Sequence, residues 1–223
     1  MRETTDRNLC ACKYTKEQFK NVYFISGCAT GGKTTISKAV AEKYGFIRYD
    51  ADAEFDKHKK LSDAVKQPTM NKQFKNADDF FLRDIDDYVQ WLKDNTTEQL
   101  PFIFDDIIKL SQSNKVVCDL HLSLNVAKQI ANYSQIVFLI RENNNDIIKD
   151  YCQRESHGDF NSFINSATNP TRAKQNCNEA LRKLNIEQCI DIMASDFFWI
   201  ARNSKSTISE TLKTVEKHFG LIC

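Results

Sequence analysis

Nine residues near the start of the chain have the types and the spacing of a phosphate-binding loop. The stretch GCATGGKTT, residues 27–35, matches the pattern G-x-x-x-x-G-K-[ST]. Three of the six glycines in the chain, Gly27, Gly31 and Gly32, lie within it. Because a chance match in a chain of this length has a probability of about one per cent, the stretch predicts a site for the phosphates of a nucleotide.

The residues on either side of the loop support this prediction. Residues 22–25 form a short run of β-branched and aromatic side chains, which predicts a buried parallel strand. Residues 36–44 carry apolar side chains at helical spacing, and Gly45 follows as a stop signal. A strand before the loop and a helix after it would direct the loop N–H groups and the helix N-terminus at the phosphates.

Each part of the loop has an expected role. Lys33 is expected to reach the phosphate oxygens as a point charge and to act in catalysis, while the Thr34 hydroxyl is expected to bind Mg²⁺. The residues expected to bind the nucleotide are Gly27, Cys28, Ala29, Thr30, Gly31, Gly32, Lys33, Thr34 and Thr35.

Acidic residues follow the second expected strand, residues 46–49. The stretch YDADAEFDKH begins at Tyr49, and its Asp50 and Asp52 would face the same crevice as the loop, since ligands gather at the carboxyl ends of parallel strands. One carboxylate would hold a water of the Mg²⁺ shell, and the other would accept a proton or a hydrogen bond from an attacking hydroxyl. The alternative interpretation is an acid that caps the next helix, with ordinary surface charge around it.

A third acidic residue ends the next expected strand, residues 116–119. Asp119 occupies the usual second nucleotide motif of P-loop proteins, where a carboxylate orients Mg²⁺ through water. His121 would face the same crevice and contact an acceptor or a phosphate, although a lone histidine is more often a structural group. Asp119 is therefore expected to belong to a metal site together with Thr34.

Two long segments are expected to complete the site. Residues 57–100 exceed what a minimal nucleotide fold needs and would carry the acceptor side. A long amphipathic helix is predicted from Ala77, and Pro101 is expected to interrupt the helical pattern. Residues 150–184 are polar, rich in asparagine and poor in strand signals, so they are expected to form a mobile lid.

Arginines in the expected lid are candidates for catalysis. Closing the lid would exclude water and bring an arginine onto the transferring phosphoryl group, where a bidentate contact stabilises the transition state. Arg154 and Arg172 are the arginines expected to do so. The alternative is that they form surface ion pairs on helices.

The order of the elements predicts an α/β fold. Five short apolar runs alternate with helical patterns, which is typical of a parallel sheet with crossover helices. These runs are residues 22–25, 46–49, 116–119, 135–140 and 197–201. No linker divides the 223 residues, so we expect one three-layer α/β/α domain of the P-loop NTPase fold over residues 1–223, with a five-stranded parallel sheet and a helical lid.

The composition excludes several classes of protein. Lys and Arg number 31 against 30 Asp and Glu, so the chain lacks the broad positive field of a nucleic-acid-binding protein. No apolar run is long enough to cross a bilayer and no secretory signal is present, so we expect a cytoplasmic protein without a membrane partner. The eight cysteines are scattered without zinc or disulfide spacing, which predicts free thiols. Nothing in the sequence indicates the oligomeric state.

The chain resembles the small P-loop kinases, and among them the shikimate-kinase-like branch. The resemblance rests on GCATGGKTT, on a helix ending in EKYGF, on YDADAEF and on the order of the elements to the end of the chain. It implies ATP as the phosphoryl donor, Mg²⁺, a small hydroxyl-bearing acceptor, Asp52 on that hydroxyl and Asp50 near the metal. It also places Arg202, directly after the last strand, where these kinases pass the chain under the adenine.

The chain departs from both neighbouring branches after the third strand. The sequence CDLHLSL stands where shikimate kinases carry a run of glycines, so the expected acceptor is not shikimate. Nucleoside monophosphate kinases have an Asp-Gly-aromatic-Pro-Arg motif there, and only its acid is matched, at Asp119. A nucleoside or nucleotide kinase remains one alternative, and a nucleotide-gated binding protein that does not transfer phosphate is another.

Overall fold

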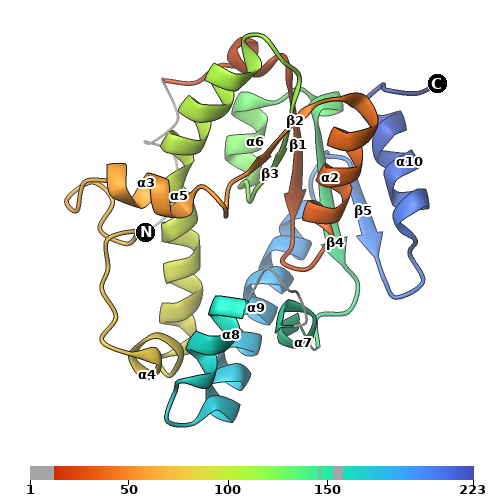
Figure 1. Ribbon diagram of the computed structural model, residues 1–223. Coiled ribbons are helices and arrows are strands. Elements are labelled where there is room, and N and C mark those ends of the chain that lie inside the picture. Colours follow the sequence, from red (N-terminus) through yellow and green to blue (C-terminus); the bar gives the residue numbers. More distant parts are fainter. Residues whose placement is uncertain (1–12, 146, 153–157) are drawn as a thin grey trace.

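A five-stranded parallel sheet lies at the centre of the protein (Figure 1). The computed structural model describes residues 13–145, 147–152 and 158–223. The strands follow the order β2-β3-β1-β4-β5, and their bounds are β1 Val22–Gly27, β2 Ile47–Asp50, β3 Val116–Asp119, β4 Ile136–Arg141 and β5 Trp199–Arg202. The predicted five-stranded parallel sheet is confirmed, and each strand begins and ends within two residues of its predicted bounds.

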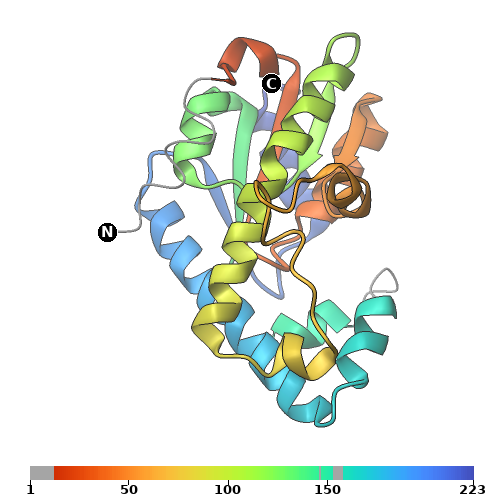
Figure 2. The same ribbon diagram turned by 90° about the vertical axis from the view of Figure 1, so that its left-hand side faces the viewer.

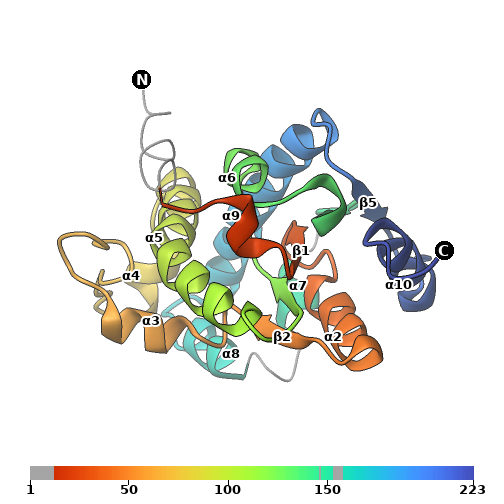
Figure 3. The same ribbon diagram turned by 90° about the horizontal axis from the view of Figure 1, so that it is seen from above.

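Helices cover both faces of the sheet, which explains why the central strands are mostly apolar. One face packs against helices α5 (Ile85–Ser111) and α6 (Leu124–Ile130), and the other packs against α2 (Lys33–Tyr44) and α10 (Ile208–His218). Figure 3 shows the sheet edge-on between these two layers. The expected three-layer α/β/α fold is therefore confirmed, and the glycine-rich stretch 27–35 spans the end of β1 and the start of α2.

A second group of helices lies beyond the carboxyl ends of the strands (Figures 1 and 2). This helical body has its own hydrophobic core, which Phe81 and Tyr88 share with Ala173 and Cys177. It consists of α4 (Ala77–Phe81), the first half of α5, α7 (Ile147–Cys152), α8 (Gly158–Asn165) and α9 (Pro170–Met193). The described parts of the expected acceptor segment and of the expected lid thus pack against each other.

Three short elements complete the described chain. The 3-10 helices η1 (Lys16–Phe19) and η2 (Tyr133–Gln135) precede β1 and β4, and α3 (Phe55–Leu61) follows β2. No helix among the described residues is long and apolar enough to span a membrane.

The helices around residue 100 differ from the prediction in two ways. The long helix does not run on from Ala77, because Asp84 caps a new helix by accepting hydrogen bonds from the N–H groups of Asp86 (2.8 Å) and Asp87 (3.4 Å). Pro101 does not interrupt α5, which continues to Ser111. Proline removes one backbone hydrogen bond from a helix, and burial of the side chains that follow it, such as Phe104, favours the continuous helix.

The described cysteines agree with the prediction of free thiols. Cys28, Cys118, Cys152, Cys177, Cys189 and Cys223 are all free. Cys10 and Cys12 lie outside the described residues.

Candidate phosphate-binding site

The phosphate loop can follow its path only because two of its residues are glycine. Gly27 has a φ of +113°, and a Cβ atom there would lie 2.2 Å from the backbone oxygen of Leu139 in the neighbouring strand β4. Gly32 has a φ of +94°, and a Cβ atom would lie 1.6 Å from a guanidinium nitrogen of Arg202. Both positions combine the left-handed backbone region with close packing, which no other residue type tolerates without strain.

The backbone N–H groups of the loop divide into two sets. Cys28 donates to Leu139 O (2.9 Å), Ala29 to Asn185 Oδ1 (2.8 Å) and Gly31 to Cys28 O (3.1 Å), and these bonds hold the loop in shape. By contrast, no side chain among the described residues caps the N-terminus of α2. The N–H groups of its first turn lack partners within the helix, so they can bind an anion together with the positive end of the helix dipole.

The side chain of Lys33 lies folded over the loop. Its ammonium group donates to the backbone oxygens of Gly27 (3.2 Å) and Cys28 (3.0 Å). Neutral carbonyl groups balance the charge of an ammonium group only in part. A phosphate bound at the start of α2 would therefore attract Lys33 strongly.

Two arginines at the ends of adjacent strands flank the loop. Arg141 ends β4 and Arg202 ends β5, and the two are paired in the sheet register. Arg202 donates to Gly31 O (3.2 Å), and Arg141 donates to the hydroxyl of Thr30 (2.7 Å) and forms an ion pair with Asp150. Burial lowers the pKa of the Arg202 guanidinium, so its charge is poorly solvated and would gain from a nearby anion.

The structure places Arg202 against the phosphate loop, and it also reveals Arg141, which the sequence analysis missed. The sequence carries a faint signal for Arg141, because this charged residue directly follows the apolar run QIVFLI at the carboxyl end of a strand. In an open α/β sheet this end is the side where ligands gather.

Asp50 and Asp119 lie side by side, because they are register partners in β2 and β3. A guanidinium that the sequence analysis missed joins them: Arg48 lies 2.6 Å from Asp50 Oδ2 and 3.4 Å from Asp119 Oδ2. Arg48 also donates to the Ser37 hydroxyl (3.0 Å). Arg48 and Asp50 are two residues apart in a strand and so share one face of the sheet, which is a signal that the sequence does contain.

The remaining predicted residues lie at different distances from the loop. Asp52 is exposed, in the turn between β2 and α3. Arg172 is exposed on the first turn of α9, 13 positions before Asn185, the residue of the same helix that contacts the loop. At 1.5 Å per residue this separation is roughly 20 Å, so this arrangement does not bring Arg172 to the loop. Arg154 lies outside the described residues.

A cavity of about 640 Å³ opens beside the loop, between α5, the connection from β3 to α6, and α9. Its lining includes Gly27 and His121. The imidazole of His121 hydrogen-bonds to the Gln188 amide, and burial together with the nearby charge of Lys33 lowers its pKa to about 3. The side chain is therefore neutral near pH 7, and it lies within electrostatic range of Lys33.

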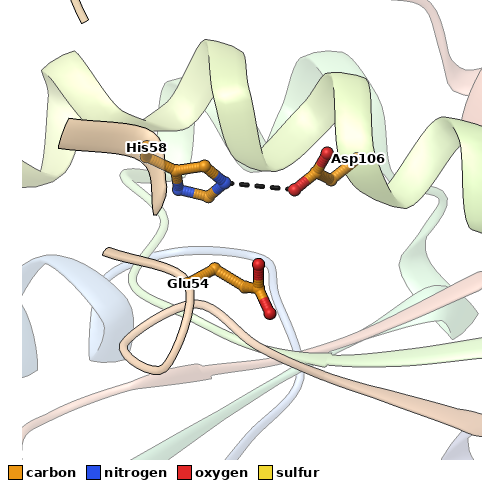
Figure 4. A group of neighbouring side chains, drawn as sticks. All are labelled: Glu54, His58 and Asp106. Carbon is orange, nitrogen blue, oxygen red and sulfur yellow. Dashed lines mark hydrogen bonds and ion pairs between the residues drawn. The ribbon is translucent and has the colours of Figure 1, made fainter. Parts of the chain in front are cut away.

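A cluster of potential metal ligands lies away from the loop, between α3 and α5. Figure 4 shows its three members: Glu54, His58 and Asp106. The ammonium group of Lys57 lies 2.6 Å from Asp106 Oδ2 and 3.1 Å from Glu54 Oε2. Lys57 thus takes the place that a metal ion would need, and we interpret the cluster as a structural ion-pair network.

Asp106 is the centre of this network, and replacing it is expected to weaken the fold. Its Oδ2 atom accepts hydrogen bonds from Lys57, His58 and Tyr49. Burial opposes ionisation of Asp106, but the hydrogen bonds from Lys57 and His58 outweigh it and lower the pKa of the carboxyl group. Asp106→Asn should reduce the free energy of unfolding at pH 7 by about 1–3 kcal/mol in urea titrations.

The pH dependence of this effect follows from the sign of the pKa shift. Because the pKa of Asp106 is lowered in the folded state, its stabilisation is fully present above the unfolded pKa, about 4, and is lost as the pH falls through the folded value. The difference between native chain and variant should therefore shrink in acid. Asp56→Asn, at an exposed position on α3, is the control and should change stability by less than about 0.5 kcal/mol. A pH-independent difference would contradict the assignment.

Comparison with known proteins gives little beyond this geometry. No protein-family model matches the chain, and no curated protein matches its sequence. One solved structure that it resembles is a deoxyadenosine kinase from M. mycoides with the products dCMP and a flexible dCDP bound. The match has a TM-score of 0.47 and 12% identity, and it covers 90% of this chain and 100% of that chain. The fold assignment rests on the sheet order and the loop.

Proposed function

We propose that this protein is an ATP-dependent phosphotransferase that moves the γ-phosphoryl group to a hydroxyl of a small molecule. The observation that carries the proposal is the anion site at the start of α2, where an uncapped helix N-terminus meets the ammonium group of Lys33. Such a site binds phosphates by position and charge, which are also the main sources of catalysis in phosphoryl transfer.

In this proposal the loop residues 27–35 hold the β- and γ-phosphates, and Lys33 neutralises the charge that develops during transfer. Arg202 and Arg141 flank the loop and would add positive charge on its outer side. Arg172 of the helical body would reach the phosphates only after that body moved towards the loop. Arg154, which lies outside the described residues, is the other arginine proposed to act in catalysis.

The residues beside the loop fit a Mg²⁺ ion that accompanies the nucleotide. Oxygen atoms are the ligands that Mg²⁺ prefers. Thr34, in the first turn of α2, supplies a hydroxyl, and Asp119, at the end of β3 next to β1, supplies a carboxylate. Arg48 lies closer to Asp50 (2.6 Å) than to Asp119 (3.4 Å). We therefore assign Asp50 a weaker role than Asp119 in holding the ion. When bound, Mg²⁺ would neutralise charge on the phosphates.

We place the acceptor in the cavity between α5 and α9, because that cavity touches both the loop and His121. Its walls carry several groups that can hydrogen-bond to hydroxyls: Gln90, Asp94, Thr97, Ser123, Asn125, Gln188 and Asp191. Another cavity, of about 600 Å³, lies at the outer edge of β2, but no loop residue lines it. The polar side chains that line the cavity between α5 and α9 therefore fit a polar, hydroxyl-bearing acceptor.

The experiment that tests the proposal is ADP release from ATP and Mg²⁺ in the presence of fractionated small metabolites. We expect one fraction to stimulate release and to yield a phosphorylated compound in that fraction. ATP binding without stimulation by any fraction would contradict a transferase and would favour a nucleotide-gated binding protein. A stimulating fraction that contains nucleosides or nucleotides would identify those as the acceptor class.

Asp52 is the proposed base for the acceptor hydroxyl. Asp52 is exposed and does not line the cavity, and its neighbour Ala51 is held to α5 by a hydrogen bond (2.9 Å) from Gln99 to the Ala51 carbonyl oxygen. In this proposal a movement of the turn between β2 and α3 brings Asp52 to the acceptor hydroxyl. Asp52→Asn should leave ATP affinity unchanged and lower the rate of transfer by about a hundredfold or more, because the amide cannot accept the proton. Isothermal titration and stimulated ADP release separate the two effects.

The matched control for this variant is Asp56→Asn, which removes one nearby exposed carboxylate on α3. It should change neither ATP affinity nor the rate of transfer. Equal losses in the two variants would show that general charge, and not a base at position 52, affects the rate.

A further inference from the structure

Two cysteines that are 161 positions apart in sequence contact each other where the phosphate loop packs against α9. The sulfur of Cys28, the second residue of the loop, lies 3.1 Å from the sulfur of Cys189 on α9, and both thiols are free. A disulfide bond is about 2.05 Å long, so the two sulfurs need to approach by only about 1 Å. We propose that Cys28 and Cys189 are a redox modification site, at which peroxide forms a reversible disulfide between the phosphate loop and α9.

The surroundings of the pair give the two cysteines different parts in the reaction. Cys28 is fully buried, whereas Cys189 is half-buried and accessible to a small oxidant. The hydrogen bond from Cys28 lowers the pKa of Cys189, and hydrogen bonds from the Arg141 backbone and the Asn144 side chain lower it further. The same contact and burial raise the pKa of Cys28. Cys189 is therefore the thiolate that attacks the oxidant, and Cys28 is the resolving thiol.

The oxidation takes place in two balanced steps. The thiolate sulfur of Cys189 attacks one oxygen of hydrogen peroxide, the O–O bond breaks, and a sulfenic acid and hydroxide form. The sulfur of Cys28 then attacks the sulfenic sulfur, its thiol proton leaves with the hydroxyl oxygen as water, and the S–S bond forms. In total, two thiols and one peroxide molecule give one disulfide and two water molecules. A dithiol reductant reverses the change.

The pair differs from the other thiols of the protein. Within the described part of the chain, no other two cysteine sulfurs are in direct contact. Among the other described cysteines, Cys118 and Cys177 are buried, Cys152 is half-buried, and Cys223 is exposed at the end of the chain. Mild oxidation should therefore produce one defined intramolecular bond.

The disulfide would make an existing contact permanent. The fully buried amide of Asn185 already forms two hydrogen bonds with the backbone of Ala29 in the loop. It accepts from the Ala29 N–H (2.8 Å) and donates to the Ala29 carbonyl oxygen (3.1 Å). Asn185 and Cys189 are four residues apart and so lie on the same side of α9. Oxidation would add a covalent bond one turn along the helix, and would close a loop of about 160 residues in the unfolded chain.

Non-reducing peptide mapping of the full chain after treatment with hydrogen peroxide tests the proposal. We expect a loss of two hydrogen atoms from the intact mass, a crosslink between the peptides that contain Cys28 and Cys189, and recovery of both thiols with dithiothreitol. The midpoint of thermal unfolding should rise by roughly 5–10 °C on oxidation. A map that links other cysteines, or none, would overturn the proposal.

Single variants test the assignment of parts independently of any enzymatic activity. In Cys28→Ser the hydroxyl can still donate to Cys189 but cannot resolve the sulfenic acid, so dimedone should label Cys189. In Cys189→Ser the buried Cys28 should stay reduced and unlabelled. Cys223→Ser is the control and should form the disulfide as the native chain does. Circular dichroism establishes that each variant folds, and absence of label on Cys189 in folded Cys28→Ser would overturn its part as the attacking thiol.

Discussion

Lys33→Ala is expected to slow phosphoryl transfer by about a hundred- to a thousandfold, and to weaken ATP binding sharply. The reason is electrostatic. The ammonium group of Lys33 lies over the loop carbonyls of Gly27 and Cys28, and it is the one loop side chain with a formal charge. In a site that excludes water, a charge aimed at the transferring group contributes several kcal/mol to transition-state stabilisation. Isothermal titration with ATP and stimulated ADP release measure the two losses.

Lys38→Ala is the matched control, because Lys38 lies on the same helix, α2, at an exposed position. It removes the same charge from the chain without touching the loop, so both ATP affinity and turnover should remain close to those of the native chain. Undiminished turnover in Lys33→Ala would refute the proposed phosphate site. Equal losses in both variants would show that net charge matters and not the position of Lys33.

Gly27→Ala is expected to reduce the free energy of unfolding by about 2–5 kcal/mol. The added Cβ atom would lie 2.2 Å from the backbone oxygen of Leu139, and β4 cannot give way without breaking its pairing with β1. The left-handed backbone of Gly27 adds roughly 1–2 kcal/mol for any residue with a Cβ atom, and overpacking adds about 1–3 kcal/mol. Urea denaturation followed by circular dichroism measures the change.

Gly158→Ala is the control for this substitution. A Cβ atom at Gly158 meets no other atom within 4 Å, and this glycine is exposed at the start of α8. The change in the free energy of unfolding should therefore be within about 0.5 kcal/mol. If Gly27→Ala were as stable as Gly158→Ala, the close approach of the loop to β4 would not exist in solution.

The parts of the structure that the sequence predicted well are those encoded by local patterns. The strands of a sheet covered on both faces are short apolar runs, so their bounds can be read directly, as for β3 at Val116–Asp119. The loop combines a chemical pattern with the strand and helix that must surround it. The prediction for Pro101 was wrong because a local rule for proline does not include the packing that holds a buried helix together.

The contacts that complete the candidate site could not be predicted from spacing. Asn185 contacts Ala29 across 156 positions, and Gln188 contacts His121 across 67. Such pairs depend on how α9 lies against the sheet, which no local pattern encodes. Arg48 is an intermediate case, because its place beside Asp50 follows from strand alternation, whereas its contact with Asp119 requires the strand order.

Helix α9 is one continuous helix that contacts the phosphate loop at Asn185, between its two ends. Its residue Ile192 belongs to the core beneath the sheet, Asn185 contacts the loop, and Ala173 belongs to the core of the helical body, all within one unbroken helix. A tilt of α9 by about 10° around Asn185 would move Arg172, roughly 20 Å away, by roughly 3 Å and would leave the contact of Asn185 with the loop in place. Any rotation of α9 about Asn185 would therefore displace Arg172 far more than it displaces the loop.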